Sequence, residues 1–132
     1  RNRFGGFADA FRMMNLPVDM SYVYFGAERA AEIEQAVDEL LEKKTECIVC
    51  MDDMICKHVI QKLRELDVNL LNTVKVASFY GGVTGSILAG QVETVEFDAK
   101  KLGFVTCNTL LDVMEGKQIA TKQLLPYKLR TI

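Results

Sequence analysis

Residues 46–53, Glu-Cys-Ile-Val-Cys-Met-Asp-Asp, decide the fold: a short apolar run ends at two carboxylates, and a helical pattern follows directly. A short apolar run bounded by polar residues is typical of a buried strand. The residues after it repeat apolar side chains at helical spacing up to residue 66, and Asp52 or Asp53 is placed to cap that helix. A buried strand that leads straight into a helix indicates an α/β fold.

The alternation of strand and helix continues on both sides of this stretch. Helices are predicted over 3–14, 27–44, 53–66 and 98–115, and strands over 20–25, 47–51, 74–79, 92–97 and 124–129. Such alternation predicts one domain with a mainly parallel sheet and right-handed crossovers. Glycines recur over 81–90, between two of the strands, and predict a loop there.

Composition and charge exclude several classes of protein. The chain has 132 residues, of which 49% are hydrophobic and 26% charged, as in an ordinary globular domain. The net charge is -2 and no basic run exceeds two lysines, which gives no electrostatic surface for nucleic acid. No apolar run approaches the ~20 residues that cross a bilayer, so we expect a cytoplasmic protein with no membrane partner. The start at Arg1, inside a helical pattern, indicates the later part of a longer protein.

The four cysteines predict no metal centre. Cys47 and Cys50 have the spacing of a zinc or redox pair, but on a strand they would point to opposite faces. Cys56 lies on the next helix, and His58 is the only histidine, so four ligands do not converge. We therefore expect these three cysteines and Cys107 to be small core residues in a reducing compartment, with no metal and no cofactor.

The two carboxylates at 52 and 53 are the sharpest candidates for chemistry, because ligands of α/β proteins bind beyond the carboxyl ends of parallel strands. Capping of the following helix is one use, which we assign mainly to Asp53. A second use is hydrogen bonding of vicinal hydroxyls of a sugar or nucleoside by Asp52. A Mg²⁺-binding acidic pocket is excluded, because residues 76–80, Val-Ala-Ser-Phe-Tyr, place no aspartate at the next strand end.

Motifs for catalysis are missing from the sequence, and no catalytic residue is predicted. There is no Gly-x-Ser-x-Gly elbow, and the glycine stretch 81–85 lacks the lysine of a phosphate-binding loop. Arg1 and Arg3 begin the first helix, either as solvated charges or as guanidinium forks presented to ligand hydroxyls. The enzyme hypothesis that stays open is an α/β enzyme that acts on a sugar or nucleotide through Asp52 and Asp53.

Five blocks of sequence together resemble the lactose-repressor-type (LacI/GalR) family of transcriptional regulators. They are residues 3–11 (RFGGFADAF), 47–54 (CIVCMDDM), 74–80 (VKVASFY), 92–103 (VETVEFDAKKLG) and 124–129 (LLPYKL). The blocks come in the family's order and with its spacing. Within the family, Ser-Phe-Tyr together with Leu-Leu-Pro-Tyr is similar to maltose-type regulators of low-GC Gram-positive bacteria.

The resemblance implies a periplasmic-binding-protein-like effector domain with a three-layer α/β/α fold. Residues 1–132 would form its C-terminal portion, one subdomain plus a crossover helix, without the DNA-binding helix-turn-helix and the first half of the sensor. The whole protein would be a homodimeric repressor and no enzyme. Its small-molecule effector, a sugar or sugar phosphate, would shift the equilibrium between DNA-competent and released states.

Carried over by position, the resemblance implies a ligand site made of Arg3, Asp52, Tyr80 and Phe25. Arg3 and Asp52 match the family's ligand-binding Arg and its Asn or Asp. Phe25, or the neighbouring Tyr24, falls near its aromatic platform. Tyr80 departs from the family, which normally has Asp there; a tyrosine can stack on a sugar ring and make one hydrogen bond.

The helix predicted over 98–115 carries a further expectation. In the family the matching helix crosses to the other subdomain, and without that subdomain its apolar face would meet water. An exposed apolar stripe of that size is unusual. We therefore expect the helix to fold back on the sheet or to be covered by a neighbouring chain.

Overall fold

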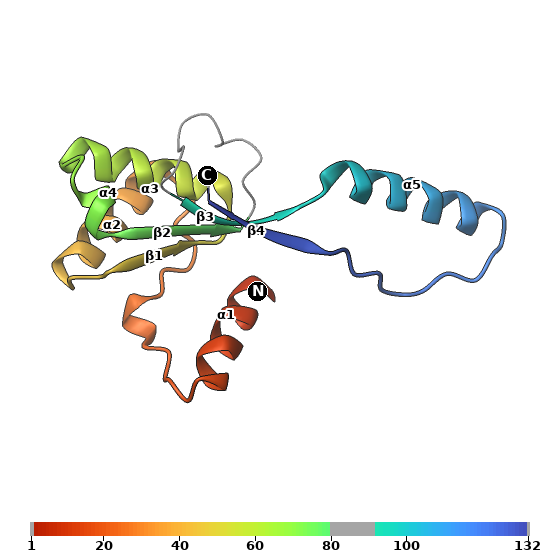
Figure 1. Ribbon diagram of the computed structural model, residues 1–132, viewed down its shortest axis with the longest axis horizontal. Coiled ribbons are helices and arrows are strands. Elements are labelled where there is room, and N and C mark those ends of the chain that lie inside the picture. Colours follow the sequence, from red (N-terminus) through yellow and green to blue (C-terminus); the bar gives the residue numbers. More distant parts are fainter. Residues whose placement is uncertain (1, 80–91, 132) are drawn as a thin grey trace.

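A four-stranded sheet organises the computed structural model, which describes residues 2–79 and 92–131 (Figure 1). Strands β1, β2 and β3 are parallel and lie in that order across the sheet, and β4 pairs antiparallel with β3. The elements are α1 (Asn2–Met13), η1 (Met20–Tyr22), α2 (Ala30–Glu42), β1 (Cys47–Cys50), α3 (Asp53–Leu66), α4 (Leu70–Thr73), β2 (Lys75–Phe79), β3 (Val92–Phe97), α5 (Ala99–Met114) and β4 (Tyr127–Thr131). The predicted α/β fold with a mainly parallel sheet is confirmed.

Helices α2 and α3 pack on one face of the sheet and form the core with it. Ile48, Val76 and Val92 are register neighbours on β1, β2 and β3, and all three are buried. Because side chains alternate along a strand, this row lies on one face. Val37 of α2 and Leu63 of α3 belong to the same buried cluster. Full burial of side chains such as these is worth about 1.5–3 kcal/mol each.

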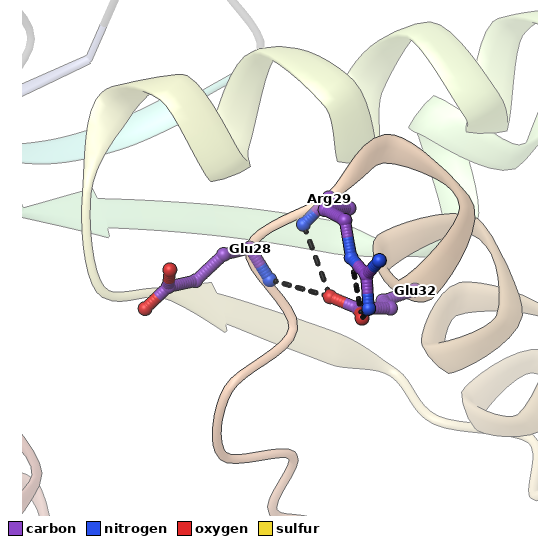
Figure 2. Close-up of polar contacts among 3 residues, drawn as sticks. All are labelled: Glu28, Arg29 and Glu32. Carbon is purple, nitrogen blue, oxygen red and sulfur yellow. Dashed lines mark hydrogen bonds and ion pairs between the residues drawn. The ribbon is translucent and has the colours of Figure 1, made fainter.

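The carboxylate of Glu32 closes the start of α2. It accepts hydrogen bonds from the backbone N–H groups of Glu28 and Arg29, at 3.2 and 3.1 Å, and from the Arg29 side chain (Figure 2). These contacts satisfy the backbone N–H groups of the two residues that directly precede the helix. The hydrogen bond from the Arg29 side chain lowers the pKa of Glu32. Because Glu32 holds residues 28 and 29 ahead of the first turn, the helix predicted over 27–44 begins later, at Ala30.

The segment 20–25, predicted as a strand, forms no ladder in the structure. Met20–Tyr22 is a 3₁₀ helix, and Val23 after it has extended backbone angles (φ -113°, ψ 118°). The hydroxyl of Tyr24 donates a hydrogen bond to Glu39 at 2.7 Å, which ties the segment to α2. The strand prediction is wrong because β-propensity acts only where a neighbouring strand offers backbone partners.

Helix α5 and strand β4, with the residues that join them, form an arm (residues 98–131). Figure 1 shows α5 well away from the other helices, at the far end of the ribbon made by β3 and β4. No residue of α5 is buried, and Phe104 is 69% exposed. The expectation that this helix folds back on the sheet is wrong, because the apolar face of the sheet is already covered by α2 and α3. Coverage by a neighbouring chain stays a prediction.

Candidate functional site

The carboxyl end of β1 carries the two aspartates. Oδ1 of Asp52 accepts a hydrogen bond from the backbone N–H of Ile55 at 2.8 Å, so Asp52 is the cap of α3. Asp53 is the first residue of that helix and is buried. The capping role that the sequence assigned mainly to Asp53 therefore belongs to Asp52, because a cap residue has an extended backbone outside the helix. The carboxylate of Asp52 has a second oxygen, which can accept from a ligand hydroxyl.

Arg3 reaches the same end of β1. Its Nη1 donates a hydrogen bond to the backbone carbonyl of Met51, the residue before Asp52. Phe4, next to Arg3 on α1, packs edge-on against Phe25 with ring centroids 5.1 Å apart. Phe25 is 68% exposed, so it retains aromatic surface for a ligand. The structure thus brings three of the four predicted site residues toward one end of β1.

Tyr80, the fourth predicted site residue, lies outside the described residues, and so does the glycine-rich stretch 81–90. Phe79 at the end of β2 is the last described residue before them. The part of Tyr80 in the site stays a prediction.

A row of buried polar side chains lies next to the predicted site. Cys50, Ser78 and Thr94 are register neighbours across β1, β2 and β3, and all three are buried. Among the described residues, Oγ of Ser78, Oγ1 of Thr94 and Oδ2 of Asp53 have no hydrogen-bond partner. Buried polar atoms are nearly always hydrogen-bonded, so these oxygens have unused capacity. The sequence interpretation missed this row because an isolated Ser or Thr gives no signal within an apolar strand.

Two of the four cysteines, both with free thiols, lie next to each other inside the protein. Interaction with the Cys56 thiol, together with burial, raises the pKa of Cys50 well above its ordinary value, and interaction with Cys50 lowers the pKa of Cys56. The nearby Ser78 hydroxyl also lowers the pKa of Cys56. Cys47 and Cys107 are exposed, so their prediction as core residues is wrong. Cys47 points away from the helix-covered face, and Cys107 lies on the uncovered α5.

An apolar pocket of about 390 Å³ lies beside β1. Helix α1 forms one of its walls, α2 another, and residues 22–25 close its outer side. It adjoins the predicted site at Met51 and Phe25. Three layers were predicted. The sheet forms one layer and α2 with α3 forms a second that packs directly on it, whereas α1, the third, is separated from α2 by this pocket. No feature of the sequence predicted the pocket.

The described residues contain no group of histidine, cysteine and carboxylate side chains that could hold a metal ion. Cys47 is exposed and Cys50 is buried, as expected for two side chains on opposite faces of one strand. In the described ranges, no helix has the length and apolar character needed to cross a membrane.

Solved structures with the same fold are transcription regulators. CcpA of Lactococcus lactis matches with a TM-score of 0.83 and 18% identity, over 98% of this chain and 48% of that one. The Escherichia coli repressor AscG matches with a TM-score of 0.78 and 19% identity, over 98% of this chain and 48% of that one. A sugar-binding LacI-family regulator of Escherichia coli was solved in complex with phosphate. It matches with a TM-score of 0.76 and 18% identity, over 97% of this chain and 47% of that one. The chain therefore spans about half the length of the structures it matches.

No protein-family model matches the sequence, and no curated protein matches it either. The structural matches reported above share fewer than one residue in five with this chain, so they show a common fold. The predicted periplasmic-binding-protein-like fold is the fold of these regulators, and the match extends over the arm as well as the sheet.

Proposed function

We propose that residues 1–132 form the C-terminal portion of the effector-binding domain of a LacI-family transcriptional repressor. The domain binds a small sugar-like effector and thereby controls DNA binding by a separate N-terminal domain. The observation that supports this most is the match to known regulators over 98% of the chain, arm included. The net charge of -2 agrees with a domain that does not itself hold DNA.

The effector site that we propose is the end of β1 where Arg3, Phe25 and Asp52 gather, completed by Tyr80. The guanidinium of Arg3 supplies several donors in a fixed plane, and the carboxylate of Asp52 accepts from ligand hydroxyls. The exposed ring of Phe25 offers an apolar face on which a sugar ring stacks. A donor, an acceptor and an aromatic face are the groups that sugars or sugar phosphates require.

In the whole protein, we propose that this site faces a second half-domain and that the repressor is a homodimer. An effector held between two halves favours the closed arrangement by the amount that its binding free energy is stronger in the closed than in the open arrangement. The coupling to DNA is the difference in effector affinity between the DNA-competent and the released states. The domain acts through binding and performs no reaction.

Calorimetry on the full-length protein, with maltose and glucose 6-phosphate as probes, tests the site. Arg3→Ala should weaken binding of the preferred probe by more than about 1 kcal/mol, because buried ligand hydroxyls would lose charged donors. Asp52→Ser should do the same while keeping a side chain that caps α3.

The matched control is Asp98→Ser in the arm. Oδ1 of Asp98 caps α5 through the N–H of Lys101 at 2.9 Å, in the same way as Asp52 caps α3. This change should leave probe affinity unaltered. Unaltered affinity in both Arg3→Ala and Asp52→Ser would remove the site assignment.

A further inference from the structure

Cys50 and Cys56 form a buried pair of thiols that the proposed effector site does not use. Cys50 is the last residue of β1, and Cys56 lies in the first turn of α3, the helix that follows this strand. The two residues are 2% and 0% exposed, and both belong to the core cluster. Both thiols are free. The connection from β1 to α3 thus places two oxidisable groups next to each other inside the protein.

The packing of α3 on the sheet sets this proximity. Cys56, Val59 and Leu63 recur at helical spacing and are all buried, so they lie on the inner face of α3. That face contacts β1 and β2, where Cys50 and Ser78 are register neighbours. Cys56 begins the apolar row of the inner face, and it therefore lies over the carboxyl ends of these two strands.

The environment makes the two thiols unequal. Interaction with Cys50, and more weakly with Ser78, lowers the pKa of Cys56, although burial and the nearby carboxylates act in the opposite direction. Interaction with Cys56 and burial raise the pKa of Cys50. The thiolate is the form of cysteine that peroxides oxidise, so Cys56 is the thiol that reacts first and Cys50 the one that attacks afterwards.

The position of Cys56 near a helix end gives a small oxidant a route to it. The first turn of a helix opens more readily than its middle. Met54, in the same turn, is half exposed. Hydrogen peroxide is hardly larger than water, and it can reach a thiol that larger reagents reach only when the core opens.

A buried hydroxyl beside Cys56 suits the oxygen that oxidation adds. Oγ of Ser78 has no hydrogen-bond partner among the described residues, and Ser78 is 5% exposed. Buried hydroxyls are nearly always hydrogen-bonded. A sulfenic acid at Cys56 would supply an O–H group next to this hydroxyl, which can either donate to it or accept from it.

We propose that Cys50 and Cys56 are a redox-sensitive pair that hydrogen peroxide converts reversibly into a disulfide. The sulfur of Cys56 attacks one peroxide oxygen, the O–O bond breaks, and the leaving hydroxide becomes water with the proton of the Cys56 thiol. The sulfur of Cys50 then attacks the sulfenic sulfur, the S–S bond forms, and the S–O bond breaks. The second hydroxide leaves as water with the proton of Cys50. Two thiols lose two electrons, and one peroxide becomes two waters.

The disulfide acts on the neighbouring cap of α3. Non-bonded heavy atoms in contact are about 3.5–4 Å apart and bonded sulfurs about 2.05 Å, so the two sulfurs approach each other by more than about 1 Å. The core around them is close-packed, and the shift therefore falls on the connection from β1 to α3. There Oδ1 of Asp52 accepts from the N–H of Ile55. A weaker effector affinity follows only under the proposed function, in which Asp52 contacts the effector.

Peptide mapping of the full-length protein after treatment with hydrogen peroxide tests the chemistry. Trypsin and Asp-N protease cut between the two cysteines and give fragments 45–51 and 53–57. A disulfide should hold these fragments together until dithiothreitol releases them. Cys56→Ala should abolish the link. The matched control is Cys47→Ala, on the other face of β1, which should leave the link intact.

Two measurements on the oxidised protein test the consequence. The amide of Ile55 should exchange with deuterium at least about tenfold faster than in the reduced protein, whereas that of Leu63, near the other end of α3, should not change. Calorimetry should show at least about tenfold weaker binding of the preferred probe, maltose or glucose 6-phosphate, because Asp52 is displaced. In Cys56→Ala, peroxide should alter neither quantity, and Cys50→Ala replaces this variant if it does not fold.

The outcomes separate the redox pair from the proposed function. Oxidation of Cys56 to a sulfinic acid without a disulfide overturns the inference, and so does a disulfide that leaves the exchange of Ile55 unaltered. A peroxide response that persists in Cys56→Ala and Cys50→Ala overturns it as well. Binding of neither probe by the reduced protein would count against the proposed function, and the disulfide and the exchange of Ile55 would still decide the inference.

Discussion

Helices α3 and α5 are both amphipathic, both begin with an aspartate cap, and both follow a strand of the same sheet, yet they end in opposite environments. Helix α3 lies on the sheet beside α2, and Leu63 on its inner face is fully buried. Helix α5 stands at the end of the arm with no buried residue. The difference teaches that the apolar pattern of a helix specifies which face needs a partner, and that the partner itself must come from elsewhere in the fold.

Thiol labelling should show the largest contrast between the two regions. Cys56 of α3 is fully buried, whereas Cys107 of α5 is exposed. With iodoacetamide and mass spectrometry, Cys107 should react on the order of a thousandfold faster or more, because Cys56 becomes accessible only when the core opens. Comparable rates would show that α3 and α5 are equally loose.

Cys47 adds a pH dependence to the same experiment. Partial burial raises the pKa of its thiol. Because the thiolate is the reacting form, the labelling rate of Cys47 should rise at a higher pH than that of a cysteine in an unfolded peptide. A rise at the same pH as in the peptide would show that the Cys47 thiol is fully solvated.

Leucine truncation compares the packing of the two helices directly. Leu63→Ala should lower the free energy of unfolding by about 2–5 kcal/mol, since it leaves a cavity in the core. Leu110→Ala in α5, where the side chain is 59% exposed, should change it by less than about 0.5 kcal/mol. Urea denaturation monitored by circular dichroism measures both. A large cost at Leu110 would mean that α5 has a partner in solution, such as a second chain.

Removal of the two helix caps should also destabilise α3 more than α5, but the difference should be smaller than for the leucine truncations. Asp52→Ala removes the hydrogen bond to the Ile55 N–H and should cost about 1 kcal/mol of global stability, because α3 is part of the core. Asp98→Ala removes the equivalent bond to Lys101, and should fray α5 without shifting the main urea transition. Equal shifts in that transition would show that the arm unfolds together with the sheet.

Ion pairs should give the smallest contrast. Lys62 of α3 contacts Asp38 of α2 at 3.1 Å, and its side chain is 17% exposed, whereas Arg130 in the arm is 62% exposed beside Glu96. Lys62→Met should change the free energy of unfolding by at most about 1 kcal/mol, and Arg130→Gln by less, because water screens the exposed pair. Denaturation at low and high salt checks both values, and a salt-sensitive loss confined to Arg130→Gln would reverse the order.

Part of the candidate site could be predicted from strand ends alone, and the rest, Arg3 and Phe25, came from the resemblance to a known family. The apolar run 47–51 located β1, and the position of Asp52 after it followed from the parallel sheet. The division of roles between Asp52 and Asp53 could not be predicted, since two adjacent aspartates have the same local preference and only the backbone angles decide which one caps. Ser78 and Thr94 were missed for a related reason: their importance comes from lying in one row with Cys50 across three strands.

The sequence by itself determined most of the element types, the mainly parallel sheet and the faces that α2 and α3 bury, because these follow from spacings of two and of 3.6 residues within short segments. Only the tertiary structure decided that residues 20–25 form no strand, that α5 stands clear of the sheet, and that a pocket opens beside β1. Each of these outcomes depends on whether a second surface is present to pair or pack with, and the pattern of one segment contains no information about the presence of another.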